Sequence, residues 1–348
     1  MMQVLVWLGL WVLAESAGGG AADRPIHKER LEYDPAARAW VEDEPPVPGT
    51  PDGDLRLARG EFAQGHNDAA YRRVKRWIKI YGELDERYPA ALILQAEVEI
   101  ARKDYYKAHK RLQEFLNEYA GTEYAQRAVE LEFVIAEMFL SGVRRKFLGF
   151  AILKADDVGI SILDDLSTNY PETNMGERAL KTKADYYYRK GEFPLAELEY
   201  GTLIKEFPRS RYYRYAMRRG ADATLASFGG VDYDDAPLIE AEERYRDYLA
   251  AYPGSAEQEG IGLILEDIRA RRAEKEYVIG RYYERTAHSR AAAYYYRSTV
   301  EHWSDTVAAT RAQDRLGKMQ TFEVPGEVSP PPPPGQGPPT LLQEEAPP

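Results

Sequence analysis

Histidines and paired carboxylates are the side chains of this sequence best suited to catalysis or metal binding. The histidines form no HExxH motif and do not stand at metal-ligand spacing on one predicted helix: His27, His66, His109, His288 and His302. Acidic pairs such as Asp156-Asp157 and Asp234-Asp235 are more typical of solvated helix faces and caps. The sequence also lacks the phosphate-binding and nucleophile-elbow motifs. We therefore predict no catalytic residue, no metal site and no cofactor.

Two runs of three tyrosines, at 186–188 and 294–296, point instead to binding. Three consecutive residues of a helix cover about 200° of arc, so part of each run packs inward while at least one hydroxyl faces a groove or solvent. Tyrosine and arginine are the residue types that most often anchor a partner surface. We predict partner-binding residues on two helices: Tyr186, Tyr187, Arg189, Arg281, Tyr282 and Tyr283. The alternative is that these aromatic rings fill the interfaces between helices.

Aromatic residues at intervals indicate which elements position these side chains. We expect six of them at the ends of helical stretches: Tyr88, Tyr119, Tyr170, Phe207, Tyr252 and Trp303. Four of the six precede a proline, which cannot continue a helix. The steps between them are 31, 51, 37, 45 and 51 residues. Such spacing is typical of a helical-repeat array.

Residues 177–210 show the unit most clearly. Gly191 is expected to close the first helix as a left-handed cap, and Phe207-Pro208 ends the second. Ala184 and Ala196 are small where the two helices must approach closely. These offsets resemble the tetratricopeptide (TPR) pattern of 34 residues. We predict an all-α TPR-type solenoid of about five to six helix–turn–helix units over residues 55–319. Inserts are expected at 141–153 and 228–235, and one long helix at about 256–287.

Composition limits the classes of function. The net charge of −11 argues against a nucleic-acid binder, although short basic stretches stand at 72–76 and 269–272. There is no cysteine, which excludes disulfides and thiolate chemistry.

The two ends of the chain differ from the body. Residues 1–22 combine an eleven-residue apolar run with a stretch of small residues, which predicts a signal peptide and export. Residues 23–54 are expected to form an extended arm, and residues 320–348 a proline-rich disordered tail.

The last repeat resembles a known family. The segments 276–285 (EYVIGRYYER), 289–293 (SRAAA) and 300–306 (VEHWSDT) are similar to the final repeat of the outer-membrane assembly lipoprotein BamD. The resemblance covers roughly residues 55–318. It implies a rod on the periplasmic face of the outer membrane that contacts a BamA-like barrel assembly component and receives unfolded outer-membrane proteins. The chain departs from the family in lacking a cysteine for lipid attachment.

We therefore expect a non-enzymatic scaffold in the periplasm, with peripheral association to the outer membrane. Three alternatives stay open: another envelope TPR adaptor in cell division or peptidoglycan coordination, an enzyme with an appended repeat region, and a cytoplasmic chaperone-type TPR protein. The body is almost entirely repeat, which leaves no room for a catalytic domain.

Overall fold

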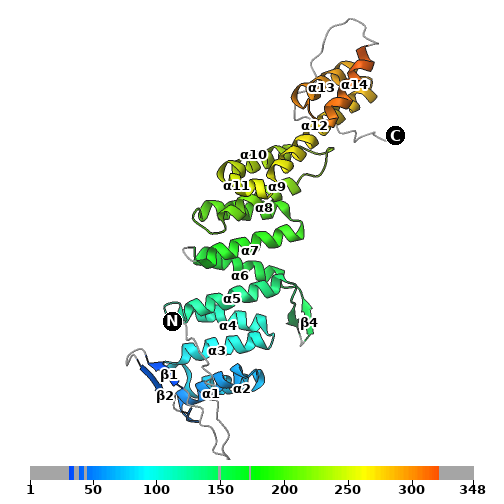
Figure 1. Ribbon diagram of the computed structural model, residues 1–348. Coiled ribbons are helices and arrows are strands. Elements are labelled where there is room, and N and C mark those ends of the chain that lie inside the picture. Colours follow the sequence, from blue (N-terminus) through cyan, green and yellow to red (C-terminus); the bar gives the residue numbers. More distant parts are fainter. Residues whose placement is uncertain (1–30, 35–38, 43–44, 148–149, 172–173, 321–348) are drawn as a thin grey trace, which may run out of the picture.

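The computed structural model describes residues 31–34, 39–42, 45–147, 150–171 and 174–320. Within these ranges it is an array of helices with two short β-hairpins (Figure 1). The strands are β1 (Leu31–Asp34), β2 (Ala39–Glu42), β3 (Arg145–Phe147) and β4 (Phe150–Leu153). The helices are α1 (Pro51–Ala63), α2 (Asn67–Tyr81), the 3-10 turn η1 (Gly82–Leu84), α3 (Tyr88–Ala101), α4 (Tyr105–Tyr119), α5 (Ala125–Leu140), α6 (Asp156–Asn169), α7 (Asn174–Lys190), α8 (Phe193–Glu206), α9 (Tyr213–Ala226), α10 (Ala236–Ala251), α11 (Pro253–Gln258), α12 (Ile261–Arg285), α13 (Ser289–His302) and α14 (Val307–Gln320).

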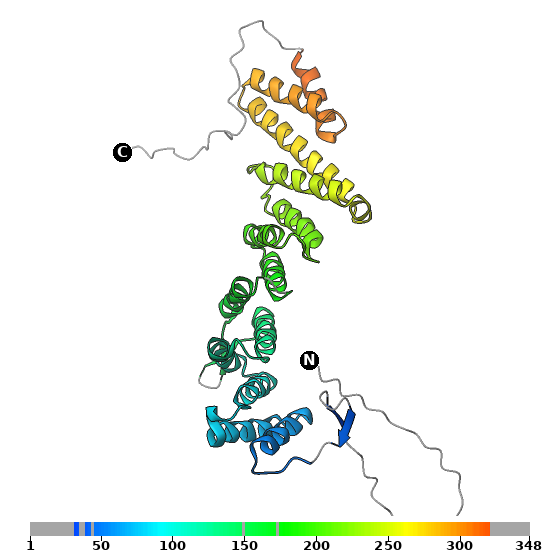
Figure 2. The same ribbon diagram turned by 90° about the vertical axis from the view of Figure 1, so that its left-hand side faces the viewer.

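Consecutive helices pair into antiparallel units that stack into an elongated array (Figures 1 and 2). The six pairs are α1–α2, α3–α4, α5–α6, α7–α8, α9–α10 and α12–α13. Helix α14 packs on α12 and α13 at the far end of the array. The TPR-type solenoid predicted from the sequence is confirmed.

The turn between the two helices has the same backbone conformation in five of the six units. At Gly191 the chain has φ of +79°, as predicted, and its N–H donates to the carbonyl of Tyr188. The next N–H, of Glu192, donates to the carbonyl of Tyr187. The same pair of bonds and a positive φ recur in four other units, at Gly65, Lys103, Gly142 and Ala287. This arrangement satisfies carbonyls at the helix end and fixes the angle between the two helices.

Five of the six punctuating aromatics end a helix or stand at its C-cap, as predicted. Tyr88 is the exception, because it begins α3 instead. Helix α2 has already stopped at Gly82, which has φ of +64°. Pro89 lies in the first turn of α3, where its missing N–H removes no helical hydrogen bond.

The long helix predicted at about 256–287 is shorter than expected. It is α12, with 25 residues, and the separate short helix α11 precedes it. Gly260, with φ of +69°, lies between the two helices and breaks the run. Helix α12 contacts both α10 and α13, so it does link the fifth pair to the last (Figure 2).

The helix expected throughout the body is interrupted once by β-structure. The insert at 141–153 contains the antiparallel hairpin β3–β4, which projects beside α5 (Figure 1). A second hairpin, β1–β2, pairs Leu31 with Glu42 inside the segment that was expected to be an extended arm. Helix α1 begins at Pro51, with Thr50 capping it through a 3.0 Å bond from the N–H of Gly53. The predicted signal peptide and proline-rich tail lie outside the described residues.

The buried residues fall into successive clusters along the array. The largest cluster joins α3 to α7 and includes Phe115, Phe133 and Phe139. Ala184 and Ala196 are both fully buried at the α7–α8 contact, as their size predicted. None of the described helices is long and apolar enough to cross a membrane.

Candidate partner-binding surface

The first helices of the first four units follow one another along one side of the array, whereas α12, the first helix of the last unit, contacts the second helix α10. Successive first helices contact one another, at α1–α3, α3–α5 and α5–α7. Among the described elements, no contact of comparable extent joins α2 to α4 or α4 to α6. Helices that approach each other lie on the inside of a curved stack. Both sets of predicted binding residues lie on first helices, α7 and α12.

Tyr186 is fixed to the neighbouring unit. Its side chain is 6% exposed, and its hydroxyl donates to Oδ2 of Asp156 on α6 at 2.6 Å. Burial, together with this bond to the carboxylate, raises the pKa of the Tyr186 phenol. The ring of Tyr187 meets it edge to face, with centroids 5.8 Å apart. Arg189 is exposed, and no ion pair to it is found among the described residues.

The predicted binding residues on α12 likewise consist of one buried tyrosine and two partly exposed residues, Tyr282 and Arg281. Tyr283 is 8% exposed and stacks on Tyr295 with centroids 5.5 Å apart and planes 5° from parallel. Tyr282 meets Tyr283 edge to face at 5.4 Å. Arg281 is partly exposed and, among the described residues, has no ion pair. The arginines are therefore free to meet a partner, while Tyr186 joins two units and Tyr283 packs between the two helices of its own unit. That these residues contact a partner stays a prediction.

Buried tyrosines recur on the second helices, and the repeat pattern does not show that their hydroxyls bond to carboxylates. The hydroxyl of Tyr245 donates to Asp222 at 2.6 Å, and that of Tyr296 donates to Glu284 at 2.6 Å. Tyr200 makes the equivalent bond to Asp185. Burial is the main reason why the pKa of each of these phenols is raised, for Tyr245 to about 12. Each bond joins the two helices of one unit.

Charged groups are also buried between helices. Glu99 is fully buried and accepts from Arg111 at 3.1 and 3.2 Å. Glu132 lies 2.8 Å from Nδ1 of His109, and burial raises the pKa of this carboxyl. Because every one of these charges has a partner across a helix contact, the pairs fix helix positions rather than form a reactive site.

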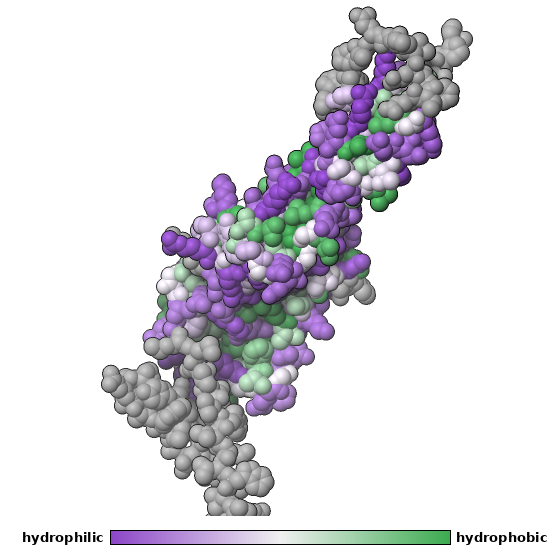
Figure 3. Space-filling model, turned by 45° about the horizontal axis from the view of Figure 1, so that its top comes forward, coloured by the Kyte–Doolittle hydropathy of each residue, from purple (hydrophilic) through white to green (hydrophobic). Residues whose placement is uncertain are grey.

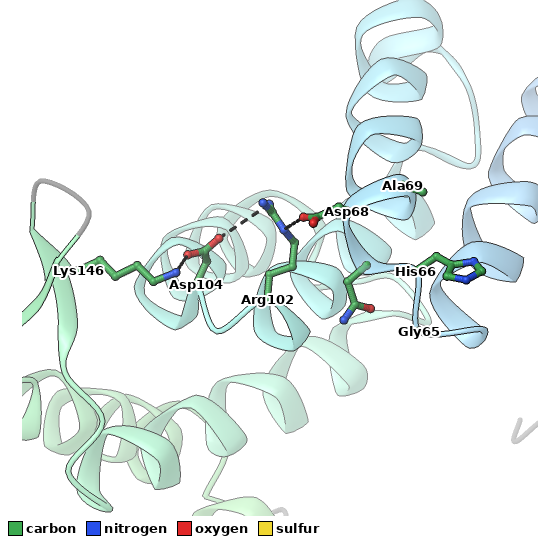
Figure 4. Close-up of a pocket in the computed structure, with 8 residues that line it drawn as sticks. Gly65, His66, Asp68, Ala69, Arg102, Asp104 and Lys146 are labelled. Carbon is green, nitrogen blue, oxygen red and sulfur yellow. Dashed lines mark hydrogen bonds and ion pairs between the residues drawn. The ribbon is translucent and has the colours of Figure 1, made fainter.

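A hollow of about 650 Å³ lies where α2 begins, near the β3–β4 hairpin (Figure 4). Its charged side chains form an alternating row: Asp68, Arg102, Asp104 and Lys146. Arg102 lies 2.9 Å from Asp68 and 3.8 Å from Asp104, and Lys146 reaches Asp104 from the hairpin. Each charged side chain of this row therefore has a neighbour of opposite charge. No group of residues suited to hold a metal ion occurs in the described part of the chain.

Most of the surface on the face in Figure 3 is hydrophilic, with hydrophobic side chains exposed between the charged ones. The exposed side chains therefore offer both ionic and apolar contacts to a partner.

A protein-family model matches residues 153–321, just under half of the chain. The family is YfiO, described as an outer membrane lipoprotein. This half of the chain is YfiO-like. The YfiO match includes the motif around Gly280 and both sets of predicted binding residues. The expected BamD-type resemblance is thus confirmed from residue 153 onward, while residues 55–152 lie outside the YfiO match.

Solved structures with similar repeats share little sequence with this chain. The C-terminal part of a TPR repeat-containing protein from Cytophaga hutchinsonii is 12% identical, with a TM-score of 0.39, over 76% of this chain and 88% of that one. A tetratricopeptide repeat protein from Parabacteroides merdae is 10% identical, with a TM-score of 0.36, over 78% of this chain and 98% of that one. No curated protein matches the sequence.

Proposed function

We propose that this protein is an exported, non-enzymatic scaffold that binds partner proteins during outer-membrane β-barrel assembly and is held at the periplasmic face of the outer membrane. The observation that carries the proposal is the YfiO match across the C-terminal units. The array supports it physically, because stacked first helices present an extended inner surface to a peptide segment or a folded domain.

Arg189 and Arg281 are the residues we propose to contact the partner first. Each stands beside a tyrosine that is packed into the array, so its helix position is fixed. Neither guanidinium has an ion pair among the described residues, so binding a carboxylate does not require an existing pair to break. Tyr187 and Tyr282, which are partly exposed on the same two helices, are proposed to add aromatic contacts.

Co-purification from detergent-solubilised envelopes tests the proposal. The full chain carrying a C-terminal tag is expected to recover a BamA-like barrel assembly component, identified by mass spectrometry. The double variant Arg189→Ala/Arg281→Ala should recover about tenfold less of it, the usual effect of losing interface arginines. The matched control is Arg209→Ala/Arg290→Ala, which removes two other exposed arginines and should recover the wild-type amount.

Two results would overturn the proposal. One is recovery of no barrel assembly component above the level of an untagged strain. The other is an equal loss of recovery in the control variant, which would mean that the loss follows from the change in net charge and not from Arg189 and Arg281. Cell fractionation with N-terminal sequencing tests export separately, and we expect a mature N-terminus near Asp23.

A further inference from the structure

Helix α2 carries a row of unpaired cations on its outer face. Its core side presents Ala70, Val74 and Trp77, all buried. The opposite side carries four exposed cations: Arg72, Lys75, Arg76 and Lys79. Among the described residues these four have no ion pair, although Arg73 on the same helix pairs with Glu61 at 2.7 Å. In a chain of net charge −11, these four cations give one face of α2 a local positive charge.

The basic surface continues onto the neighbouring unit and the hairpin. Helix α2 is contacted by Arg102, at the end of α3, through Asp68, and by Lys107, at the start of α4, through Tyr71. Lys103 and Lys110 are exposed on the same stretch. The hairpin packs on α4, where the guanidinium of Arg145 lies 4.8 Å from the ring centroid of Tyr106. It adds the exposed cations Arg144 and Lys154, and Lys146, which pairs with Asp104. Glu114 and Glu118 bound this surface at the end of α4.

Exposed aliphatic side chains flank the cations. Ile80, one helical turn after Arg76, is 55% exposed, and Leu84 in η1 is fully exposed. At the hairpin, Ile152 is 52% exposed and Leu153 is 39% exposed. Cations with neighbouring exposed aliphatics form the pattern by which a protein surface lies on a charged membrane. The cations meet the headgroups, and the aliphatics enter the boundary with the acyl chains.

We propose that this basic face, formed by the outer side of α2, the start of α4 and the β3–β4 hairpin, docks the array on an anionic phospholipid surface. A nucleic acid would use the cations but would gain little from Leu84 and Ile152, and competition by soluble polyglutamate distinguishes an acidic protein from a membrane. The rest of the acidic array is repelled by such a membrane, so the basic face also sets the orientation. The inference rests on the proposed function, because it assigns specific residues to the membrane association proposed there. It assigns that contact to residues before the YfiO match, apart from Leu153 and Lys154 at its start.

Vesicle flotation of the purified full chain tests the docking face. We expect binding to vesicles of 40% phosphatidylglycerol and 60% phosphatidylcholine to exceed binding to pure phosphatidylcholine at least about tenfold, and to fall as salt rises from 50 to 300 mM. The apolar run near residue 4 affects both vesicle types, so the difference between them is the measured quantity. The variant Arg72→Gln/Lys75→Gln/Arg76→Gln/Lys79→Gln should lose that difference. Leu84→Ser should lower anionic binding about threefold.

The matched control removes four other exposed cations that have no ion pair among the described residues: Arg209→Gln/Arg285→Gln/Arg290→Gln/Arg297→Gln. It carries the same change in net charge and should bind as the wild type does. The proposal is overturned if both quadruple variants bind anionic vesicles equally. It is also overturned if Leu84→Ser has no effect while soluble polyglutamate competes fully, because that result would assign the face to an acidic protein. Unchanged circular dichroism and thermal midpoints confirm that the variants fold. Because no partner protein is present, failure here leaves the co-purification result standing, and the reverse also holds.

Discussion

The two halves of the array are packed with different side chains. The largest fully buried side chains before residue 170 are aliphatic or aromatic without a hydroxyl: Trp77, Phe115, Phe133, Phe139, Leu112, Ile135, Leu163 and Leu166. Those after residue 170 are all tyrosines: Tyr200, Tyr245, Tyr248 and Tyr296. A buried hydroxyl requires a partner, and each of these four donates to a carboxylate. The largest buried side chains of the first half therefore pack mainly by apolar shape, beside the buried pairs of Glu99 and Glu132, whereas those of the second half are tyrosines bonded to carboxylates.

The boundary between the two packing modes lies close to the start of the YfiO match at residue 153. The tyrosine-rich half carries the proposed partner-binding arginines, while the apolar half carries the hairpin and the unpaired cations of α2. A hydrogen-bonded half suits the docking of one defined partner, because the bonds fix the two helices of a unit against each other. The difference suggests separate roles for the two halves, and substitutions can test it.

Phe133→Ala should have the largest effect on stability. Phe133 is 2% exposed in the largest apolar cluster, and the guanidinium of Arg178 lies 4.2 Å from its ring centroid. Removing the ring leaves a cavity and should lower the free energy of unfolding by about 3–5 kcal/mol. The adjacent residue Val134 is 38% exposed, so Val134→Ala serves as the control and should cost less than about 0.5 kcal/mol. Urea denaturation measures both, and a loss below about 1 kcal/mol for Phe133→Ala would contradict apolar packing as the main support of this half.

Gly280→Ala should have an intermediate effect in the other half. A Cβ at Gly280 would stand 2.7 Å from Cε1 of Tyr296, closer than two carbons can approach. Tyr296 cannot move away freely because its hydroxyl is bonded to Glu284 at 2.6 Å. We expect a loss of about 1–3 kcal/mol. Gly262 lies on the same helix with open space around its Cα, so Gly262→Ala is the control and should be neutral or slightly stabilising. Equal thermal midpoints for the two variants would show that the close contact of Gly280 with Tyr296 does not stabilise the packing of α12 on α13.

Much of the architecture could be predicted because each unit repeats local signals. The cap at Gly191 and the close approach at Ala184 and Ala196 follow from residue size and backbone freedom, which a sequence displays directly. Lys103 and Ala287 adopt the same left-handed conformation as Gly191, with φ of +60° and +59°. Their side chains give no sign of it, because the turn is imposed by the packing of the two helices.

The tyrosine–carboxylate bonds could not be predicted. Their partners are 15, 23 and 12 residues apart, at Tyr200–Asp185, Tyr245–Asp222 and Tyr296–Glu284. No fixed spacing exists because the bond depends on how two helices are rotated against each other. The basic stretch at 72–76 was visible in the sequence, but only the structure shows which of its cations lack a partner. For the same reason the sequence did not show which of the tyrosines in the predicted binding set are buried, namely Tyr186 and Tyr283.

Tyr245→Phe gives the smallest expected effect and tests the bonds of the second half. Tyr245 is 1% exposed and donates to Asp222, which keeps its contacts with Arg218 and Arg219 after the change. Because the carboxylate stays paired, the loss at pH 7 should be about 1–2 kcal/mol. Tyr233→Phe, at a tyrosine 66% exposed, is the control and should change nothing.

The pH dependence of this loss identifies its origin. Burial raises the pKa of the Tyr245 phenol to about 12, above its ordinary value of 10. A raised pKa in the folded state means that the contribution to stability is fully present below pH 10 and is lost as the pH rises toward 12. Phenylalanine cannot ionise, so the difference between wild type and Tyr245→Phe should shrink over this range. Urea midpoints at pH 7, 9, 10.5 and 11.5 measure it. If the difference in stability stays constant across this range, the Tyr245 hydroxyl does not contribute to it, and the ring alone stabilises this contact.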